Sequence, residues 1–174
     1  MNLLAAMTLV VGVLAALVTW LFTGPVLSGL GLSLWAVFLG WASFFNQGGG
    51  EEGLKKSVFG ALWGTIVGTI AFVLYNSGLF GGLGDLAFTA IVGITAALLV
   101  AGSIVPVFSA IPAGFYGYAA TAAFAFLGNH VGDALSMNFA TMPFLNIFTS
   151  MLIGALFGYV SEKLIGALAA KAPA

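Results

Sequence analysis

Apolar residues run along most of this chain in long stretches, which short clusters of glycine, proline and polar residues separate. A helix needs roughly 20 apolar residues to cross the hydrocarbon core of a membrane. The clusters between the stretches, such as Gly24-Pro25, are typical of turns. The pattern therefore predicts six membrane-crossing helices, at residues 3–23, 27–45, 55–78, 86–105, 112–128 and 143–164.

The composition supports this interpretation, because 61% of the 174 residues are hydrophobic and only 5% are charged. Four lysines and five carboxylates are too few to cover a surface that faces water. We expect an all-α integral membrane protein in which residues 1–174 form a single membrane domain. Its main partner is then the lipid bilayer.

The positions of the lysines predict the orientation in the membrane. Six crossings place both termini and the loops 46–54 and 106–111 on one side. All four lysines then lie on that side, namely Lys55, Lys56, Lys163 and Lys171. Because lysine and arginine in short loops are retained in the cytoplasm, we expect both termini to be cytoplasmic.

The two halves of the chain resemble each other. "TLVVGVLAAL" at 8–17 aligns with "TAIVGITAAL" at 89–98, and "FLGWA" at 38–42 aligns with "FYGYA" at 115–119. A unit of three crossings enters the membrane upside down in its second copy, so we expect two inverted three-helix repeats. One repeat covers about 1–80 and the other about 81–174. The alternative is a chance alignment, because membrane segments use few residue types.

The third helix of each half carries a small residue at every fourth position. This spacing lets helix backbones approach closely, either within the chain or between subunits. We therefore predict that these residues are helix-packing positions, and we expect a homo-oligomer because six short helices enclose little volume. The positions are Gly60, Gly64, Gly68, Ser150, Gly154 and Gly158.

Aromatic side chains lie on one face of the second helix of each half, and amide side chains occur at the end of each of these helices. Their spacing of three or four residues puts them on one helix face. We interpret them as two mouths of one solute pathway, lined by Phe38, Trp41, Asn46, Phe115, Tyr118, Asn129 and His130. The alternative is that the aromatic rings belong to the core or to the membrane interface and that the asparagines end helices.

Charged groups near the middle of the predicted spans are missing, and this argues against proton- or cation-coupled transport, which needs an ionisable residue at that depth. We expect Glu162 to lie at the interface or to pair with a lysine. A lone histidine, His130, cannot assemble a metal site, and a catalytic triad would also need a nucleophile and a carboxylate that the fold brings to it. Asp133 is three residues away, so we expect a solvated loop pair, and an acid–base pair is the alternative. No phosphate-binding loop or basic stripe occurs. The sequence therefore predicts no enzyme activity, no metal, no cofactor and no nucleic-acid partner.

Two strings of small and aromatic residues carry a family resemblance: "WASFFNQGG" at 41–49 and "IPAGFYGYAATAAF" at 111–124. With these strings, and over essentially its whole length, the chain resembles the domain of unknown function 1097 family of small bacterial inner-membrane proteins. The resemblance implies a six-span protein of the bacterial inner (cytoplasmic) membrane. It brings no activity and no catalytic residue with it.

Two function classes agree with these features. The first is a passive channel or facilitator for a small uncharged solute such as urea, ammonia, water, a small amide or a gas. The second is a membrane scaffold or partner subunit that transports nothing, for which the faces of small residues are the working surface. A proton-coupled transporter that uses Glu162 or Asp85 is a third alternative.

Overall fold

The computed structural model describes residues 1–169, and Lys171 lies outside the described residues. Helices account for most of this part of the chain, and short 3-10 turns join several of them. The six α-helices within residues 1–169 are α1 (Leu3–Thr23), α2 (Leu34–Asn46), α3 (Gly50–Asn76), α4 (Ala87–Ala101), α5 (Ile111–Leu127) and α6 (Pro143–Ala169).

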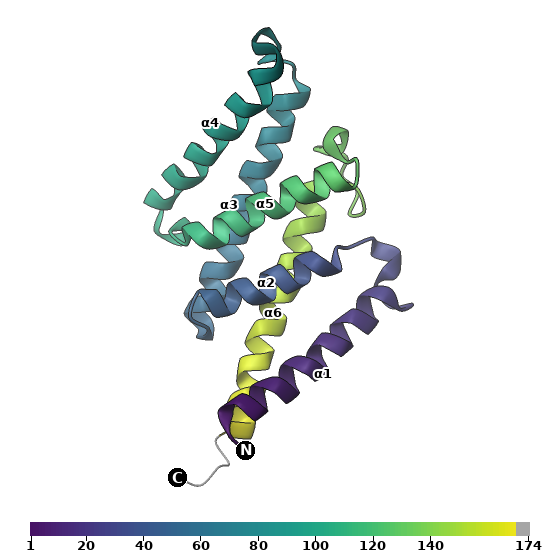
Figure 1. Ribbon diagram of the computed structural model, residues 1–174, viewed down its shortest axis with the longest axis vertical. Coiled ribbons are helices and arrows are strands. Elements are labelled where there is room, and N and C mark those ends of the chain that lie inside the picture. Colours follow the sequence, from purple (N-terminus) through teal and green to yellow (C-terminus); the bar gives the residue numbers. More distant parts are fainter. Residues whose placement is uncertain (170–174) are drawn as a thin grey trace.

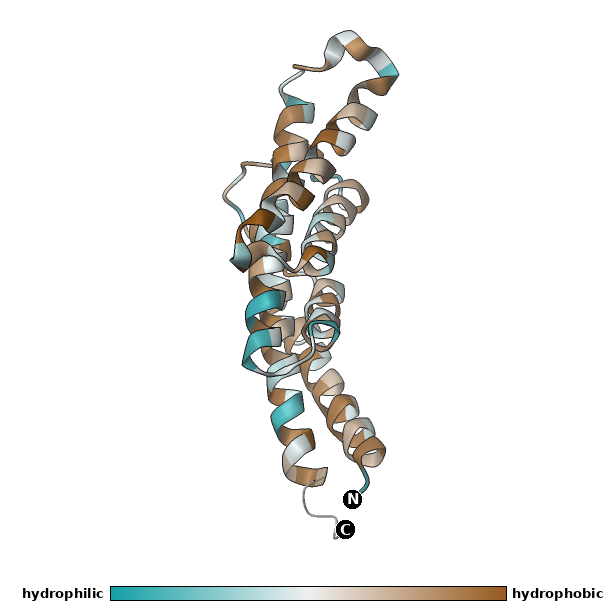
Figure 2. Cartoon of the chain, turned by 90° about the vertical axis from the view of Figure 1, so that its left-hand side faces the viewer, coloured by the Kyte–Doolittle hydropathy of each residue, from teal (hydrophilic) through white to brown (hydrophobic). Residues whose placement is uncertain are grey.

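The helices lie in two layers. The long helices α3 and α6 form one layer, and α2 and α5 cross in front of them (Figure 1). Helix α1 packs beside α6, and α4 packs beside α3. In the edge-on view, hydrophobic residues cover most of the helices, and hydrophilic residues gather at the start of α3 and near other helix ends (Figure 2). Many large hydrophobic side chains are exposed, as the composition predicts for a chain surrounded by lipid.

Within the described part of the chain, four helical segments are long and apolar enough to cross a membrane, whereas the sequence pattern predicted six. They are Leu3–Thr23, Gly50–Asn76, Pro143–Ala169 and Gly81–Ile104, which joins α4 to the 3-10 turns at its two ends. Helix α2 has 13 residues and α5 has 17. At 1.5 Å per residue these two helices are only about 20 and 26 Å long. Both are apolar but shorter than a hydrocarbon core of about 30 Å.

Glycines explain why α2 and α3 differ from the predicted ranges 27–45 and 55–78. Gly31 has φ +64°, a left-handed conformation that ends the 3-10 turn before it, so α2 begins only at Leu34. Gly48, Gly49 and Gly50 have φ +92°, +70° and +64° and reverse the chain within a few residues. Helix α3 therefore starts at Gly50, and the predicted loop 46–54 is mostly helix.

Close backbone contacts hold α3 against α5 and α6 against α2. A Cβ atom at Gly64 would overlap the Gly114 carbonyl oxygen and lie 2.9 Å from the nitrogen of Tyr118. A Cβ atom at Gly154 would overlap the Val37 carbonyl oxygen and lie 2.9 Å from the nitrogen of Trp41. Only glycine permits such an approach, in which dispersion between well-packed backbones stabilises the helix pair.

The same contact pattern recurs one turn to each side of these glycines. Gly68 packs on Thr121 of α5, as Gly158 packs on Phe44 of α2. Gly60 packs on Ala113, whereas Ser150 accepts a hydrogen bond at 3.1 Å from the Ser33 backbone N–H. The five predicted glycines thus face another helix of the same chain, and Ser150 faces the residue that precedes α2.

Candidate functional site

Trp41 and Phe38 of α2 form the first group of predicted pathway residues. The Trp41 side chain is buried, and its Nε1–H donates a hydrogen bond of 3.1 Å to Ser161 Oγ of α6. The Phe38 ring stacks on Trp41 with 6.1 Å between the ring centroids and remains 39% exposed. Helix α2 thus presents one buried and one surface aromatic ring next to α6.

Tyr118 and Phe115 occupy the aligned positions of α5. The Tyr118 hydroxyl lies 2.9 Å from Thr95 Oγ1 of α4, and Phe115 is 40% exposed. Tyr118 also borders an apolar cavity of about 300 Å³ between α3, α4 and α5. The other residues that line the cavity are Gly68, Ala71, Phe72, Phe88, Val92, Ala119, Ala122 and Phe126.

The three remaining pathway residues lie at helix ends. Asn46 is the exposed last residue of α2. Asn129 follows α5 with φ +57°, a left-handed conformation that asparagine tolerates where helices end. The His130 ring stacks on Phe124 at 4.8 Å, and its Nδ1 lies 2.9 Å from Asp133 Oδ2. The seven predicted residues therefore form an α2 group, an α5 group and two separate ends rather than one continuous site.

A carboxylate holds the glycine turn between α2 and α3. Glu162 of α6 accepts a hydrogen bond of 2.8 Å from the Gly50 backbone N–H, at the N-terminus of α3. Negative charge at that helix end is favourable because the backbone N–H groups there have no partner within the helix. Lys163, the neighbour of Glu162, lies over the Tyr159 ring at 4.9 Å. Among residues 1–169, the partner of this carboxylate is thus a backbone N–H and not a lysine.

Asn146 is a buried polar centre that the sequence analysis missed. Its Nδ2 donates to the carbonyl oxygens of Gly31 and Phe139, both at 2.7 Å, and its Oδ1 accepts from Ser33 Oγ at 2.6 Å. The side chain is fully buried in the first turns of α6. Asn146 thereby joins the segment before α2 to the segment before α6. A lone amide inside a predicted span was the available signal.

Four buried polar side-chain atoms have no hydrogen-bond partner among the described residues. Thr65, Thr95 and Thr121, which are also buried, donate to backbone carbonyls one turn earlier. The unpartnered atoms are Ser43 Oγ, Gln47 Nε2, Ser57 Oγ and Thr69 Oγ1. Buried polar atoms without a partner are rare, and ordered water is one usual explanation.

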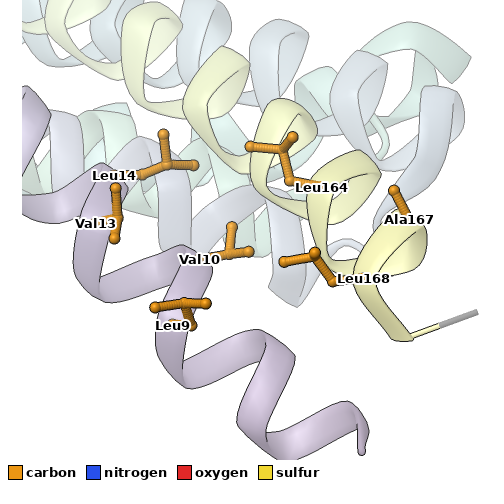
Figure 3. Close-up of a pocket in the computed structure, with 7 residues that line it drawn as sticks. All are labelled: Leu9, Val10, Val13, Leu14, Leu164, Ala167 and Leu168. Carbon is orange, nitrogen blue, oxygen red and sulfur yellow. The ribbon is translucent and has the colours of Figure 1, made fainter. Parts of the chain in front are cut away.

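An apolar groove runs between α1 and the end of α6 (Figure 3). Its volume is about 320 Å³. Aliphatic side chains of both helices point toward it, and no polar side chain lines it. The lining residues are Leu9, Val10, Val13, Leu14, Leu164, Ala167 and Leu168. Within residues 1–169, no three His, Cys, Asp or Glu side chains gather in a way that suits a metal ion.

The family of proteins described as "Protein of unknown function (DUF1097)" matches residues 8–166. The chain belongs to this family. The match runs from the first turns of α1 almost to the end of α6, so it includes all or most of each of the six helices. No curated protein and no solved structure matches the chain. Family membership therefore identifies the kind of protein without assigning a reaction, a ligand or a partner.

Proposed function

We propose that this chain is a passive channel or facilitator for a small uncharged solute in the bacterial inner membrane. In this proposal the chain crosses the membrane six times as two inverted three-helix repeats, with both termini in the cytoplasm. The solutes that fit are urea, ammonia, water, a small amide or a dissolved gas. The copies form a homo-oligomer.

The contacts between helices support the inverted repeat. Helix α3 packs on α5 as α6 packs on α2, and α4 lies beside α3 as α1 lies beside α6. Gly64 meets the backbone of Gly114 and Tyr118, and Gly154 meets the backbone of Val37 and Trp41. In the alignment of "FLGWA" with "FYGYA", Val37 corresponds to Gly114 and Trp41 to Tyr118. The two halves therefore use aligned residues for aligned contacts.

The observation that carries the proposed function is the placement of the two short helices. Helices α2 and α5, with 13 and 17 residues, cross the long helices of the opposite half near the middle of the molecule (Figure 1). Transporters built from inverted repeats place their solute path at the interface between repeats, beside interrupted helices. A non-helical backbone is tolerated at membrane depth where protein surrounds it or where it lines a cavity.

The charges favour a passive mechanism. Glu162 is the one carboxylate within the long helix α6, and its partner is a helix N-terminus at the end of the span. Asp85 lies in the 3-10 turn before α4. A group that changes its charge at the middle of the membrane, as proton coupling requires, is thus missing from the described helices. A neutral solute needs no such group.

The apolar groove between α1 and α6 favours the second candidate, a membrane scaffold or partner subunit. A groove lined only by aliphatic side chains accepts a lipid chain or an apolar helix through close packing. In that case the protein works by contact with another membrane component and passes no solute. The two candidates differ in one measurable property, the permeability of a membrane that contains the protein.

Stopped-flow light scattering on proteoliposomes tests the proposal with a panel of neutral solutes. We expect the protein to raise the permeability for at least one of them. Phe38→Ala combined with Phe115→Ala should change the flux more than Trp20→Ala, because Phe38 and Phe115 occupy aligned sites on the two short helices, whereas Trp20 is exposed near the end of α1. Permeability that the protein changes for no solute, or equal effects of both variants, would contradict the proposal.

A further inference from the structure

We propose that Ser43, Gln47 and Ser57 form one polar recess between α2 and α3 that binds small neutral hydrogen-bonding molecules, water being the smallest. The side chains of Ser43 and Ser57 are 0% and 1% exposed, and Ser43 Oγ, Gln47 Nε2 and Ser57 Oγ have no partner among the described residues. The existence of this recess does not depend on whether the protein transports a solute. As the cytoplasmic opening of a solute path, it rests on the proposed function.

The three side chains lie at one level of the same helix pair. Ser43 and Gln47 are one turn apart, since the Gln47 N–H donates to the Ser43 carbonyl oxygen at 2.9 Å. A Cβ atom at Gly53 would lie 3.3 Å from the carbonyl oxygens of both Gln47 and Phe44, so this face of α3 meets the end of α2. Ser57 is the next residue on that face.

The next turn fixes the position of Ser57 from the other side. Ala61, one turn beyond Ser57 on α3, belongs to the same buried cluster as Ala36 of α2. Ser57 therefore lies between the contact at Gly53 and this shared cluster. On α2, Ser43 lies between Gln47 and Ala36, and in this proposal the two hydroxyl groups face the same space. The three-residue turn at 47–49 keeps both helices close on this side.

The corresponding positions in the second half of the chain, in α5 and α6, carry apolar side chains. In the repeat alignment, Ser43 corresponds to Ala120 and Ser57 to Ile147, and these two residues pack in one apolar cluster. Gln47 corresponds to Phe124, an aromatic ring that packs against the same cluster. Three polar side chains in the first half thus replace three apolar side chains in the second. The recess is present on one side only.

The chemistry of the three groups suits a neutral guest. Each serine hydroxyl donates one hydrogen bond and accepts two, and the glutamine amide nitrogen donates two. A buried water molecule needs two to four such partners, which this set supplies. No charged side chain belongs to the set, so an ion would lose its hydration without compensation. Leaving the same groups dry would destabilise the fold, because each buried group without a partner costs about 1–3 kcal/mol.

The glycine turn forms the end of the recess that lies nearest the helix termini. Gln47 immediately precedes Gly48, and Glu162 holds Gly50 from α6. Toward the middle of the molecule, the cluster of Ala36, Ala61, Ala120, Ile147 and Met151 closes the space with apolar side chains. The recess is therefore a vestibule with one polar end and one apolar end.

Thiol labelling tests the recess directly, because the chain contains no cysteine. Single-cysteine variants Ser43→Cys and Ser57→Cys are reconstituted in proteoliposomes and treated with a small water-soluble methanethiosulfonate reagent. Only the thiolate reacts, and it forms only in a polar, hydrated environment. We expect both cysteines to react at least about tenfold faster than the matched control Ala120→Cys, which is equally buried at 2%. Rates equal to that of the control would overturn the proposal.

Thermal unfolding of Ser43→Ala combined with Ser57→Ala provides a second measurement if a cysteine variant fails to fold. In a hydrated recess this double change leaves the melting temperature unchanged or lowers it. A rise would mean that two unpaired hydroxyls had been removed from a dry site, and would also overturn the proposal. Fast labelling without any solute flux would retain the recess and reject the proposed function, whereas flux with unreactive cysteines would reject the recess alone.

Discussion

The crossing of α2 and α6 gives the sharpest prediction, because a single added methyl group should force these helices apart. The change is Gly154→Ala. The new Cβ atom would lie 2.8 Å from the carbonyl carbon of Val37 and 2.9 Å from the backbone nitrogen of Trp41, and it would overlap the Val37 carbonyl oxygen. All three nearest atoms are backbone atoms of α2, so no side chain can rotate away to make room. The helices themselves must move.

The cost follows from the distances. Ordinary contact of a Cβ atom begins at 3.4 Å, so the helices must separate by at least about 0.6 Å at the carbonyl carbon alone. The full attraction of one facing atom pair is about 0.1–0.2 kcal/mol, and a gap of that size removes about a quarter of it. Over about 50 facing pairs the loss reaches roughly 2 kcal/mol. Remaining strain at Val37 raises the total to about 3 kcal/mol, at the upper end of the usual cost of overpacking.

Gly166→Ala is the matched control in the same helix. No atom lies within 4 Å of a Cβ atom at Gly166, so this change should stabilise α6 by up to about 1 kcal/mol through helix propensity alone. Unfolding titrations in mixed detergent micelles, followed by tryptophan fluorescence, compare the free energies of unfolding. We expect the two variants to differ by about 4 kcal/mol, the sum of a 3 kcal/mol loss and a 1 kcal/mol gain. A difference below about 1 kcal/mol would refute the proposed close approach.

Two further predictions concern polar contacts and use the same unfolding titration. Glu162→Gln should destabilise the protein by about 1 kcal/mol, because it removes a partly buried carboxylate that accepts a hydrogen bond at the α3 N-terminus. Glu52→Gln also removes a charge in the first turn of α3, but Glu52 is exposed and has no such bond within residues 1–169, so this change should cost clearly less. Equal effects of the two changes would argue against the Glu162 contact. Asn146→Ala should cost about 3 kcal/mol, because it removes three hydrogen bonds worth about 1 kcal/mol each, one of them to the buried Ser33 hydroxyl. The exposed Asn138→Ala serves as its control, and an equally large loss there would count against the role of Asn146.

The lengths of the apolar stretches correctly predicted the helices whose ends coincide with the ends of those stretches. The expected range 3–23 coincides with α1, and the ranges 112–128 and 143–164 agree with α5 and α6 to within a few residues. Each of these helices is a continuous apolar stretch that ends at a breaker. Where conformation and not hydrophobicity decides the boundary, the prediction was wrong. Gly31 delays α2 and the left-handed glycines 48–50 advance α3, and a hydropathy pattern contains no φ angle.

The candidate site was harder to predict, because it depends on residues that are distant in sequence. Trp41 meets Ser161 and Ser33 meets Asn146 only because α2 lies across α6. The glycine spacing in α3 and α6 indicated close packing, but it did not identify which helix each glycine contacts. Ser43 and Ser57 look like ordinary small residues in the sequence. Their distinction, burial without a partner, depends on the three-dimensional packing.

The difference between the two halves limits which solutes suit the proposed path. A solute that enters the recess at Ser43 and Ser57 leaves water while it retains hydrogen bonds. The next step leads to the apolar cluster around Ala61 and Met151, which offers none. An ion loses its hydration there without compensation, and the free energy of a molecule with many polar groups rises by several kcal/mol. Among the proposed solutes, ammonia or a gas leaves fewer hydrogen bonds unmade at this step than urea does. If the apolar cluster around Ala61 and Met151 remains closed, the measured permeability should be higher for ammonia or a gas than for urea.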